Sequence, residues 1–356
     1  MDLTDLYQKV KDIKAVSKDY VVEGKHLRAQ PLGPKELSLD VSGLGSFQVG
    51  RFCHEQIAEK AGIPLKYYQR MLENGATQLL SDNVNRWLPD KERRMIRTLA
   101  YPDQPVIRAL VSSKFRALDN FDLLQSSMEV FQEYRNTGHS VNIAQAYMTD
   151  TGFYLKAITD RREAIKKDDV VEAGVIIRNS EVGRGSLRVE PYVNRLYCMN
   201  GAIVGTYKRF HIGGDKGMGH IWSEITRNEQ DKLIWLEVRD IVGATLKGEF
   251  LDQYVQEQKG LIEIELEKPL ETVRAVVERQ GCSKEEMDAI INSFVKEKDT
   301  TAYGAVNAIT SIAKFQDIER QMELEEMGFR VGQEFLGKID VKKTTNIGSD
   351  TDLIRP

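Results

Sequence analysis

Residues 174–203, GVIIRNSEVGRGSLRVEPYVNRLYCMNGAI, constrain the fold of this chain more than any other stretch. Segments 174–178 and 186–190 alternate in polarity and are rich in β-branched residues, which is typical of strands. Between them, residues 179–185 contain two glycines, an Asn and a Ser. The pattern predicts a β-hairpin with a wide, flexible tip.

The polar residues of this hairpin are mostly basic. Four arginines stand against two glutamates: Arg178, Arg184, Arg188 and Arg195 against Glu181 and Glu190. Because alternate residues of a strand project to the same face, Arg184 and Arg188 are expected to share a side. Two interpretations stay open, namely solvated charges on a strand face or one edge of an anion-binding surface.

The distribution of charge distinguishes the middle of the chain from its ends. The net charge is −4, which alone disfavours nucleic acid as a partner. However, residues 91–116 hold seven Lys and Arg against two acidic residues, and residues 174–220 hold seven against three. The two windows together carry +9, so the remaining chain carries −13. A basic middle lies between acidic flanks, and this restores nucleic acid as a candidate partner.

Cysteine usage and hydropathy narrow the class of protein. The three cysteines, Cys53, Cys198 and Cys282, are far apart and form no CxxC pair, so we expect a reducing compartment and no structural zinc. The chain contains no apolar run of membrane-spanning length, and its start, MDLTDLYQKVKDIKAV, is charged. A cytoplasmic protein without membrane contact is expected.

Periodicity predicts an α+β fold with a central, mostly antiparallel sheet that contains the long hairpin. We expect two further strands at 141–148 and 152–159, a charged connection at 160–169, and one continuous helix over 303–327. Five regions are expected: short strands and turns (1–50), a helical module (51–100), a strand-rich basic core (101–220), a helical C-terminal part (221–340) and a polar tail (341–356).

Several segments, in matching order over about residues 50–330, resemble a known family. They are IAEKAGIPLKYYQRML with NVNRWL, VIRALVSSKFRALDNFDLL, GVIIRNSEVGRGSLRVEPYVNRLYCMNG, and TAYGAVNAITSIAKF with RQMELEEMG. The chain resembles the phage/plasmid-related proteins catalogued as domain of unknown function 932 (DUF932). The resemblance implies a mobile-element setting and no particular reaction. Where the family commonly has a Tyr, this chain has Phe115.

Two loops contain the most plausible ligand-binding residues outside the hairpin. In SSKFRALDN (112–120), Lys114 and Arg116 beside serine hydroxyls suit a phosphate, whereas Asp119 or Asn120 suits a helix N-cap. In HIGGDKGMGH (211–220), four glycines accompany Lys216, and the histidines match no known metal pattern. For this second loop, a plain connection and a cover over a polyanion are both open.

Aromatic residues are interleaved with the cations, as in proteins that bind single-stranded nucleic acid. The rings are Phe115, Tyr192, Tyr197, Tyr207 and Phe210, most of them expected in the core, and one or two exposed rings are sufficient. The nucleic-acid-binding residues predicted on this basis are Lys114, Arg116, Arg178, Arg184, Arg188, Arg195, Lys208, Arg209 and Lys216.

These features predict a single-stranded DNA binding or annealing protein of a phage or mobile element, without a cofactor or catalytic residues. An analogy with phage annealases implies a homo-oligomer, a ring or a filament. One alternative is a phosphate-directed enzyme of nucleic-acid or nucleotide metabolism that uses Asp119, His211 and a divalent ion. The other is an interaction protein that counters a host defence factor.

Overall fold

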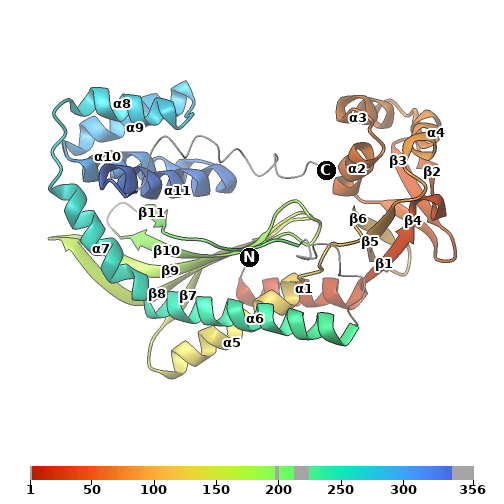
Figure 1. The fold of residues 1–356 in the computed structure, drawn as a ribbon, viewed down its shortest axis with the longest axis horizontal. Coiled ribbons are helices and arrows are strands. Elements are labelled where there is room, and N and C mark those ends of the chain that lie inside the picture. Colours follow the sequence, from red (N-terminus) through yellow and green to blue (C-terminus); the bar gives the residue numbers. More distant parts are fainter. Residues whose placement is uncertain (1, 197–199, 212–223, 339–356) are drawn as a thin grey trace.

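A computed structural model describes residues 2–196, 200–211 and 224–338 of the chain (Figure 1). It contains two 6-stranded sheets and helices at both ends of the described chain. The predicted α+β class is therefore confirmed. The polar tail, Tyr197, Cys198 and Lys216 lie outside the described residues.

The first sheet belongs to the N-terminal part of the chain. Its strands are β1 (Ser17–Glu23), β2 (Leu27–Gly33), β3 (Glu36–Val41), β4 (Gly45–Val49), β5 (Arg93–Leu99) and β6 (Val106–Ser112), in the order β1-β5-β6-β4-β3-β2. The pair β4–β6 is parallel and the other pairs are antiparallel. The boundary expected near residue 100 falls inside this sheet, because β5 and β6 return to pair with the N-terminal strands.

Three short helices pack against the first sheet: α2 (Arg51–Lys60), α3 (Leu65–Glu73) and α4 (Thr77–Trp87). Gly62 adopts a φ of 65°, the left-handed conformation that ends many helices, and Pro64 precedes α3. Ile57, Leu80 and Val84 are fully buried in the core between helices and sheet. The predicted helical module is confirmed as part of this N-terminal lobe, which we define as residues 17–112.

The second sheet lies at the centre of the molecule and is antiparallel throughout. Its strands are β7 (Val141–Met148), β8 (Phe153–Lys166), β9 (Asp169–Asn179), β10 (Leu187–Arg195) and β11 (Asn200–Ile203), with β12 (Tyr207–Arg209) also paired with β10. The predicted hairpin is β9–β10, in which Arg188 lies opposite Arg178 and Arg195 opposite Val171. Both strands are longer than the sequence pattern indicated.

The segment at 160–169 is strand, and the predicted charged connection is wrong. β8 continues to Lys166, which pairs directly with Asp169 of β9. The turn between them is closed by Asp168, whose φ of 64° suits a two-residue hairpin turn. The many charged residues of this segment suggested a connection, but alternate residues of a strand can face solvent. The cations among them pair with carboxylates, as Arg162 does with Glu172 at 2.7 Å.

Helices cover both faces of the central sheet. On one face lie α1 (Leu3–Val16), α5 (Asn120–Asn136) and α6 (Glu224–Lys247), which bury Leu155 and Val189 of the sheet. On the other face lies α11 (Ile318–Phe335), whose Met322 packs with Tyr192. The α11 helix leaves the tip end of the β9–β10 hairpin uncovered (Figure 1).

The C-terminal lobe, residues 249–338, is helical as predicted. It consists of α7 (Glu249–Ile262), α8 (Pro269–Arg279), α9 (Lys284–Glu297), α10 (Ala302–Ser311) and α11. The predicted single helix over 303–327 is wrong, because a 3-10 turn at Ala313–Phe315 separates α10 from α11. The Asp317 side chain accepts a hydrogen bond from Arg320 N and so starts the new helix.

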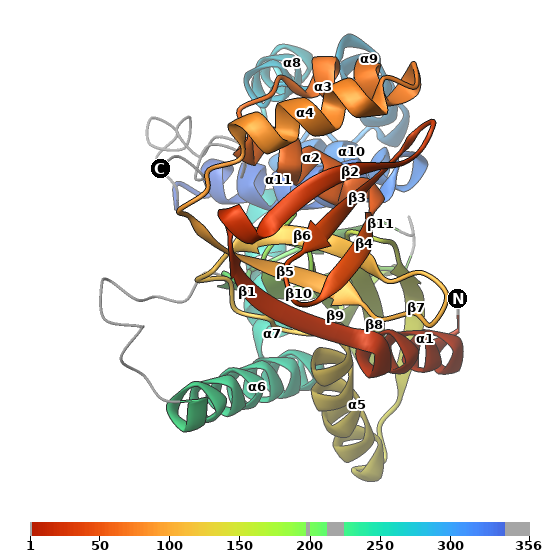
Figure 2. The same ribbon diagram turned by 90° about the vertical axis from the view of Figure 1, so that its right-hand side faces the viewer.

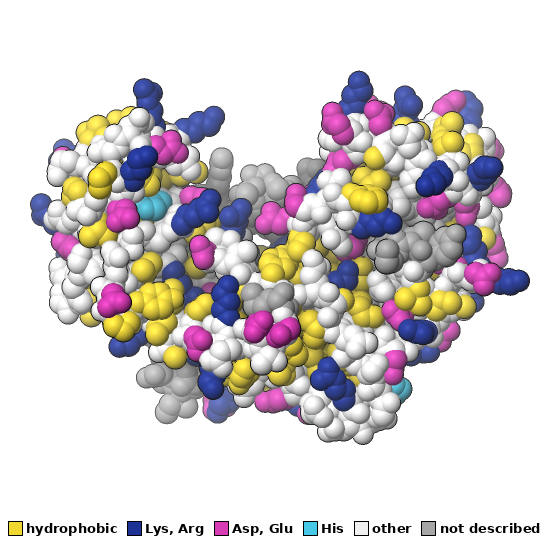
Figure 3. Space-filling model, turned by 180° about the vertical axis from the view of Figure 1, so that it is seen from behind, with side chains coloured by type: hydrophobic (Ala, Val, Ile, Leu, Met, Phe, Trp, Pro, Cys, Tyr) yellow, Lys and Arg dark blue, Asp and Glu magenta, His cyan; other side chains and the backbone are white. Residues whose placement is uncertain are grey.

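The N-terminal and C-terminal lobes stand on either side of a hollow, which we call the notch (Figures 1 and 3). The β9–β10 hairpin crosses beneath it, and its tip bonds to the N-terminal lobe (Figure 1). In Figure 2 the N-terminal lobe faces the viewer, and its strands lie in front of the central sheet. Among the helices of the described residues, none is long and apolar enough to cross a membrane.

Candidate nucleic-acid interface

Three of the predicted cations form a row across neighbouring strands. Arg178 of β9 lies directly opposite Arg188 of β10, and Arg188 lies directly opposite Lys208 of β12. Residues directly opposite in an antiparallel sheet share a face, so the three side chains lie on the face that α11 partly covers. Like charges in this register repel, which indicates that the row needs anionic neighbours.

Two glutamates provide part of that negative charge. The fully buried Glu190 accepts hydrogen bonds from Arg178 at 2.7 and 2.5 Å and lies 3.9 Å from Arg188. Glu326 of α11 lies 3.3 Å from Arg178. Burial and the nearby Glu190 raise the pKa of Glu326, so this carboxylate is a weaker counter-charge than an exposed one. Both glutamates therefore lie beside the row, and Arg178 contacts each of them.

The row lies on the floor of the notch. Arg178 contacts α11 of the C-terminal lobe, and Glu181, three residues later, contacts Arg108 of the N-terminal lobe. The Arg178 and Arg188 side chains are each 20% exposed, so their outer atoms reach the surface.

The two basic sequence windows meet beside the hairpin tip. Arg116 N donates a hydrogen bond to the carbonyl oxygen of His211. The Phe115 ring stacks on the His211 ring at 4.8 Å between centroids, and a Cβ on Gly183 of the tip would lie 3.5 Å from Phe115. Segments 114–116, 183–184 and 208–211 are therefore neighbours in space although they are remote in sequence.

Exposed groups lie around this junction. Lys114 and Arg184 are exposed, and the Arg184 guanidinium lies 5.8 Å from the centre of the Phe52 ring. Phe210 is 52% exposed, with Lys208 Nζ at 4.7 Å from its ring centre. Of the rings named from sequence, Phe115 and Tyr192 are buried. Tyr207 is half-buried and its hydroxyl donates to Glu237 of α6, whereas the exposed Phe210 ring is able to stack on a base.

Other predicted cations are held in ion pairs. Arg116 pairs with Asp231 of α6, and Arg209 lies 3.5 Å from Glu237 on the opposite face of the sheet. Arg195 lies at the far end of the hairpin, where it pairs with Asp169 through two hydrogen bonds of 2.7 Å. The structure therefore does not bring Arg195 or Arg209 to the row.

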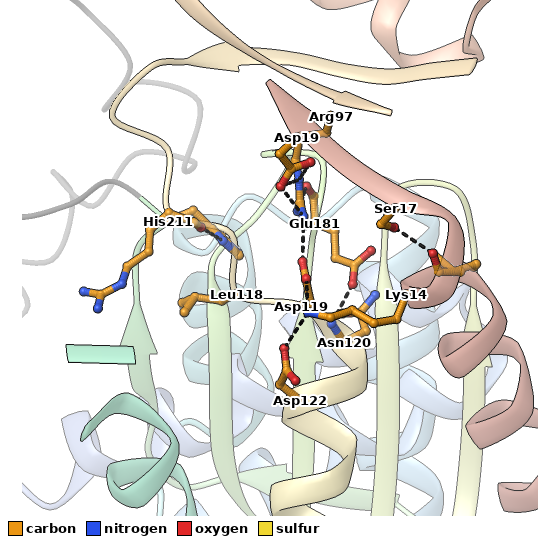
Figure 4. Close-up of polar contacts among 12 residues, drawn as sticks. Lys14, Ser17, Asp19, Arg97, Leu118, Asp119, Asn120, Asp122, Glu181 and His211 are labelled. Carbon is orange, nitrogen blue, oxygen red and sulfur yellow. Dashed lines mark hydrogen bonds and ion pairs between the residues drawn. The ribbon is translucent and has the colours of Figure 1, made fainter. Parts of the chain in front are cut away.

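Three arginines of the first basic window are held in ion pairs. Arg94 pairs with Glu92 at 2.5 Å, Arg108 pairs with Glu181, and Arg97 is 1% exposed. Arg97 bonds to Asp19 at 3.0 Å and to Asp119 at 2.6 Å (Figure 4). Arg97 and Arg108 join different elements, and all three arginines are engaged in ion pairs.

The buried Asp119 lies at the centre of this polar network. Lys14 of α1 donates to its second carboxylate oxygen at 2.6 Å and to Asp122 at 3.0 Å (Figure 4). Burial alone raises the pKa of Asp119, but Arg97 and Lys14 outweigh burial and lower the pKa to about 2. Asp119 is the N-cap residue of α5, as predicted, yet its side chain makes no capping hydrogen bond.

The hairpin tip completes the network, and the expected flexible tip is wrong. Asn179, Ser180 and Glu181 are 3%, 4% and 7% exposed. Glu181 accepts a hydrogen bond from Asn120 N at 2.6 Å and so caps α5 from another element. Gln56 Nε2 donates to Val182 O at 2.8 Å. The tip is fixed because its polar groups bond to the N-terminal lobe and to α5.

His211 and Asp119 are the residues on which the enzymatic alternative depends, and both have structural partners. His211 Nε2 lies 2.9 Å from Asn179 Oδ1, and Nδ1 lies 2.9 Å from Arg116 O. Burial lowers the pKa of His211 to about 4, despite the Arg116 carbonyl. Within the described ranges, no group of three or more His, Cys, Asp or Glu side chains is placed to hold a metal ion.

Sequence reasoning missed the buried group that joins the lobe to the sheet. Gln56 and Glu181 were not recognised as contacts, because their partners are 54 to 126 positions away. The only available signal was an acidic residue within a basic hairpin, which suits an internal ion pair.

Comparisons with known proteins provide no relative: no family model, curated protein or solved structure matches this chain. The resemblance to the DUF932 proteins thus remains an expectation from sequence, and the geometry of the notch is the basis for a functional proposal.

Proposed function

We propose that this protein binds single-stranded DNA across the notch, as a non-catalytic binding or annealing protein of a phage or other mobile element. The row of Arg178, Arg188 and Lys208 carries this proposal. It places three cations in register on the surface between two lobes. A phosphate backbone is a row of anions that such a row of cations can contact.

The groups around the row suit a single strand better than a duplex. Phe210 is exposed and lies beside Lys208, so a base can stack on the ring while the cation contacts the adjacent phosphate. Lys114 and Arg184 extend the positive charge from the row toward the N-terminal lobe. Bases in a duplex are already stacked and cannot use the ring. The annealing role and the oligomeric assembly come from the analogy with phage annealases, and the mobile-element setting comes from the family resemblance. All three belong to the same proposal.

The test is the binding of labelled oligonucleotides to the full chain, measured by fluorescence anisotropy. We expect the single strand to bind more tightly than a duplex of the same length. The double variant Lys114→Gln/Arg184→Gln is expected to bind about tenfold more weakly, because two exposed phosphate contacts are lost. The control Lys268→Gln removes a lysine that is 72% exposed and precedes α8 as its N-cap residue, outside the notch. Equal binding by the double variant and the control would contradict the proposal, as would the absence of binding.

A further inference from the structure

A separate pocket of about 340 Å³ lies where α1, the start of α2 and the turn between β7 and β8 meet. Its size falls within the range of small-molecule sites. Its lining includes the deep Arg108–Glu181 pair, so the pocket reaches the contact between the N-terminal lobe and the hairpin tip.

Cations from three elements converge on this pocket: Lys9 of α1, Arg51 of α2 and Arg108 of β6. Arg108 is paired with Glu181, which leaves Lys9 and Arg51 as exposed positive charges in the lining. Lys9 Nζ donates to Met148 O at 3.1 Å, so its ammonium is held against the pocket wall. An anionic group placed between Lys9 and Arg51 gains two charge-assisted contacts.

The first turn of α2 adds backbone donors to the same pocket. Gly50 is the N-cap residue and has no side chain that accepts the first amide groups of the helix. Gly50, Arg51 and Phe52 all line the pocket. A Cβ at Gly50 would lie 3.0 Å from Ile107 O, so a larger capping residue is disfavoured here. The positive end of the helix dipole therefore faces the space that the two cations border.

Apolar side chains also line the pocket and suit a flat ring. Ile13, Leu99, Tyr101 and Met148 provide this surface, and Tyr101 is 43% exposed. Asp150, on the β7–β8 turn, is an exposed acceptor in the same lining. The lining therefore offers contacts for both a phosphate and a base.

We infer that this pocket binds a phosphate monoester carried by a nucleoside. The ligand is either a free mononucleotide or the 5′-phosphorylated end of a strand. Lys9, Arg51 and the first turn of α2 contact the phosphate, and Tyr101 contacts the base. The inference does not depend on the notch, because its residues differ from those of the cationic row.

Isothermal titration of the full chain with adenosine 5′-monophosphate, adenosine and inorganic phosphate tests the free-nucleotide source. Anisotropy with 5′-phosphorylated and 5′-hydroxyl oligonucleotides tests the strand-end source. Two pairs of ligands are compared: adenosine 5′-monophosphate with adenosine, and the 5′-phosphorylated with the 5′-hydroxyl oligonucleotide. We expect the phosphorylated ligand to bind more tightly in at least one of these pairs. The variant Arg51→Gln is expected to lose about tenfold in that affinity, since one charged contact is removed. The control Arg70→Gln changes an exposed arginine on α3.

The inference is overturned if the 5′-phosphate improves binding in neither pair, or if Arg51→Gln and Arg70→Gln have the same effect. Thermal unfolding of both variants shows whether they remain folded. A second variant, Lys9→Gln, repeats the test from α1, a different element. Loss of nucleotide binding in Arg51→Gln with unchanged binding of a 5′-hydroxyl oligonucleotide separates this pocket from the notch.

Discussion

The tip of the β9–β10 hairpin and the strands behind it carry similar charges but use them differently. At the tip, Arg97 and Arg108 are deeply buried and bonded to Asp19, Asp119 and Glu181. On the strands, Arg178, Arg188 and Lys208 lie in register on the face that α11 partly covers, where the Arg178 and Arg188 side chains are each 20% exposed. The difference teaches that the number of arginines in a window does not indicate how many are available to a ligand. Burial and the nearest carboxylate decide whether an arginine is available.

The largest expected effect comes from breaking the network at the tip. Asp119→Ala leaves the guanidinium of Arg97 buried without its 2.6 Å partner. We expect the free energy of unfolding to fall by roughly 3–5 kcal/mol, as for other buried ion pairs that lose one partner. Urea unfolding measures this quantity.

Asp122→Ala is the matched control, because Asp122 is three residues away, 37% exposed and paired with the same Lys14. The Asp122→Ala substitution is expected to lower the free energy of unfolding by less than about 1 kcal/mol. Similar losses in the two variants would show that the network at the tip is not a special source of stability.

The second effect is a loss of stability in acid. Burial lowers the pKa of both His54 and His211 from 6.5 to about 4. The unfolded chain therefore binds more protons than the folded chain between these pH values, and stability falls as the pH decreases from 6.5 to 4. The loss is on the order of 3 kcal/mol per histidine at most. Urea unfolding at pH 7, 5.5 and 4.5 measures it, and a constant free energy over this range would contradict the burial of both rings.

The third prediction concerns the notch. Phe210→Ala is expected to weaken single-strand binding by roughly 1–3 kcal/mol, because a stacking platform is lost. The free energy of unfolding is expected to stay nearly constant, since the ring is 52% exposed. Phe210→Tyr keeps the aromatic face and is expected to retain binding. Unchanged affinity in Phe210→Ala would remove the ring from the proposed interface.

The smallest expected effect is a change in salt dependence. Lys114→Gln removes one exposed cation and is expected to reduce the slope of log affinity against log salt by about 0.7 for a single strand. Affinity measurements at several salt concentrations give this slope. Lys268→Gln is the control outside the notch, and a slope that changes equally in both variants would indicate a nonspecific effect of charge.

Much of the fold could be predicted from the sequence, because local hydrophobic patterns specify the helices and the strand pairs. The part of the chain after residue 224 is helical where it is described, as predicted, and the β7–β8 and β9–β10 pairs form as predicted. Predictions were wrong where the structure of a segment depends on residues that are remote in sequence. The strand at 160–169 is charged because its exposed face makes ion pairs. The tip is rigid because Gln56 and Arg97 bond to it across the lobe boundary.

The candidate site was predictable only in part. Sequence identified Arg178, Arg188 and Lys208 as cations, but not that three strands bring them into register. It also could not separate Phe210, which is exposed, from Tyr192, which is 1% exposed under α11. Both rings belong to strand-rich segments with similar neighbours. Exposure depends on which helix covers the sheet, and local sequence does not carry that information.

The most direct test of the proposed interface is photo-crosslinking of the full chain to a bromodeoxyuridine oligonucleotide, with the modified peptides identified by mass spectrometry. We predict crosslinks to the exposed Phe210, to the peptide that contains the exposed Arg184, and to the peptide that contains Lys208 of the cationic row. Crosslinks confined to α8 and α9, with none near the β9–β10 hairpin, would contradict the proposed interface.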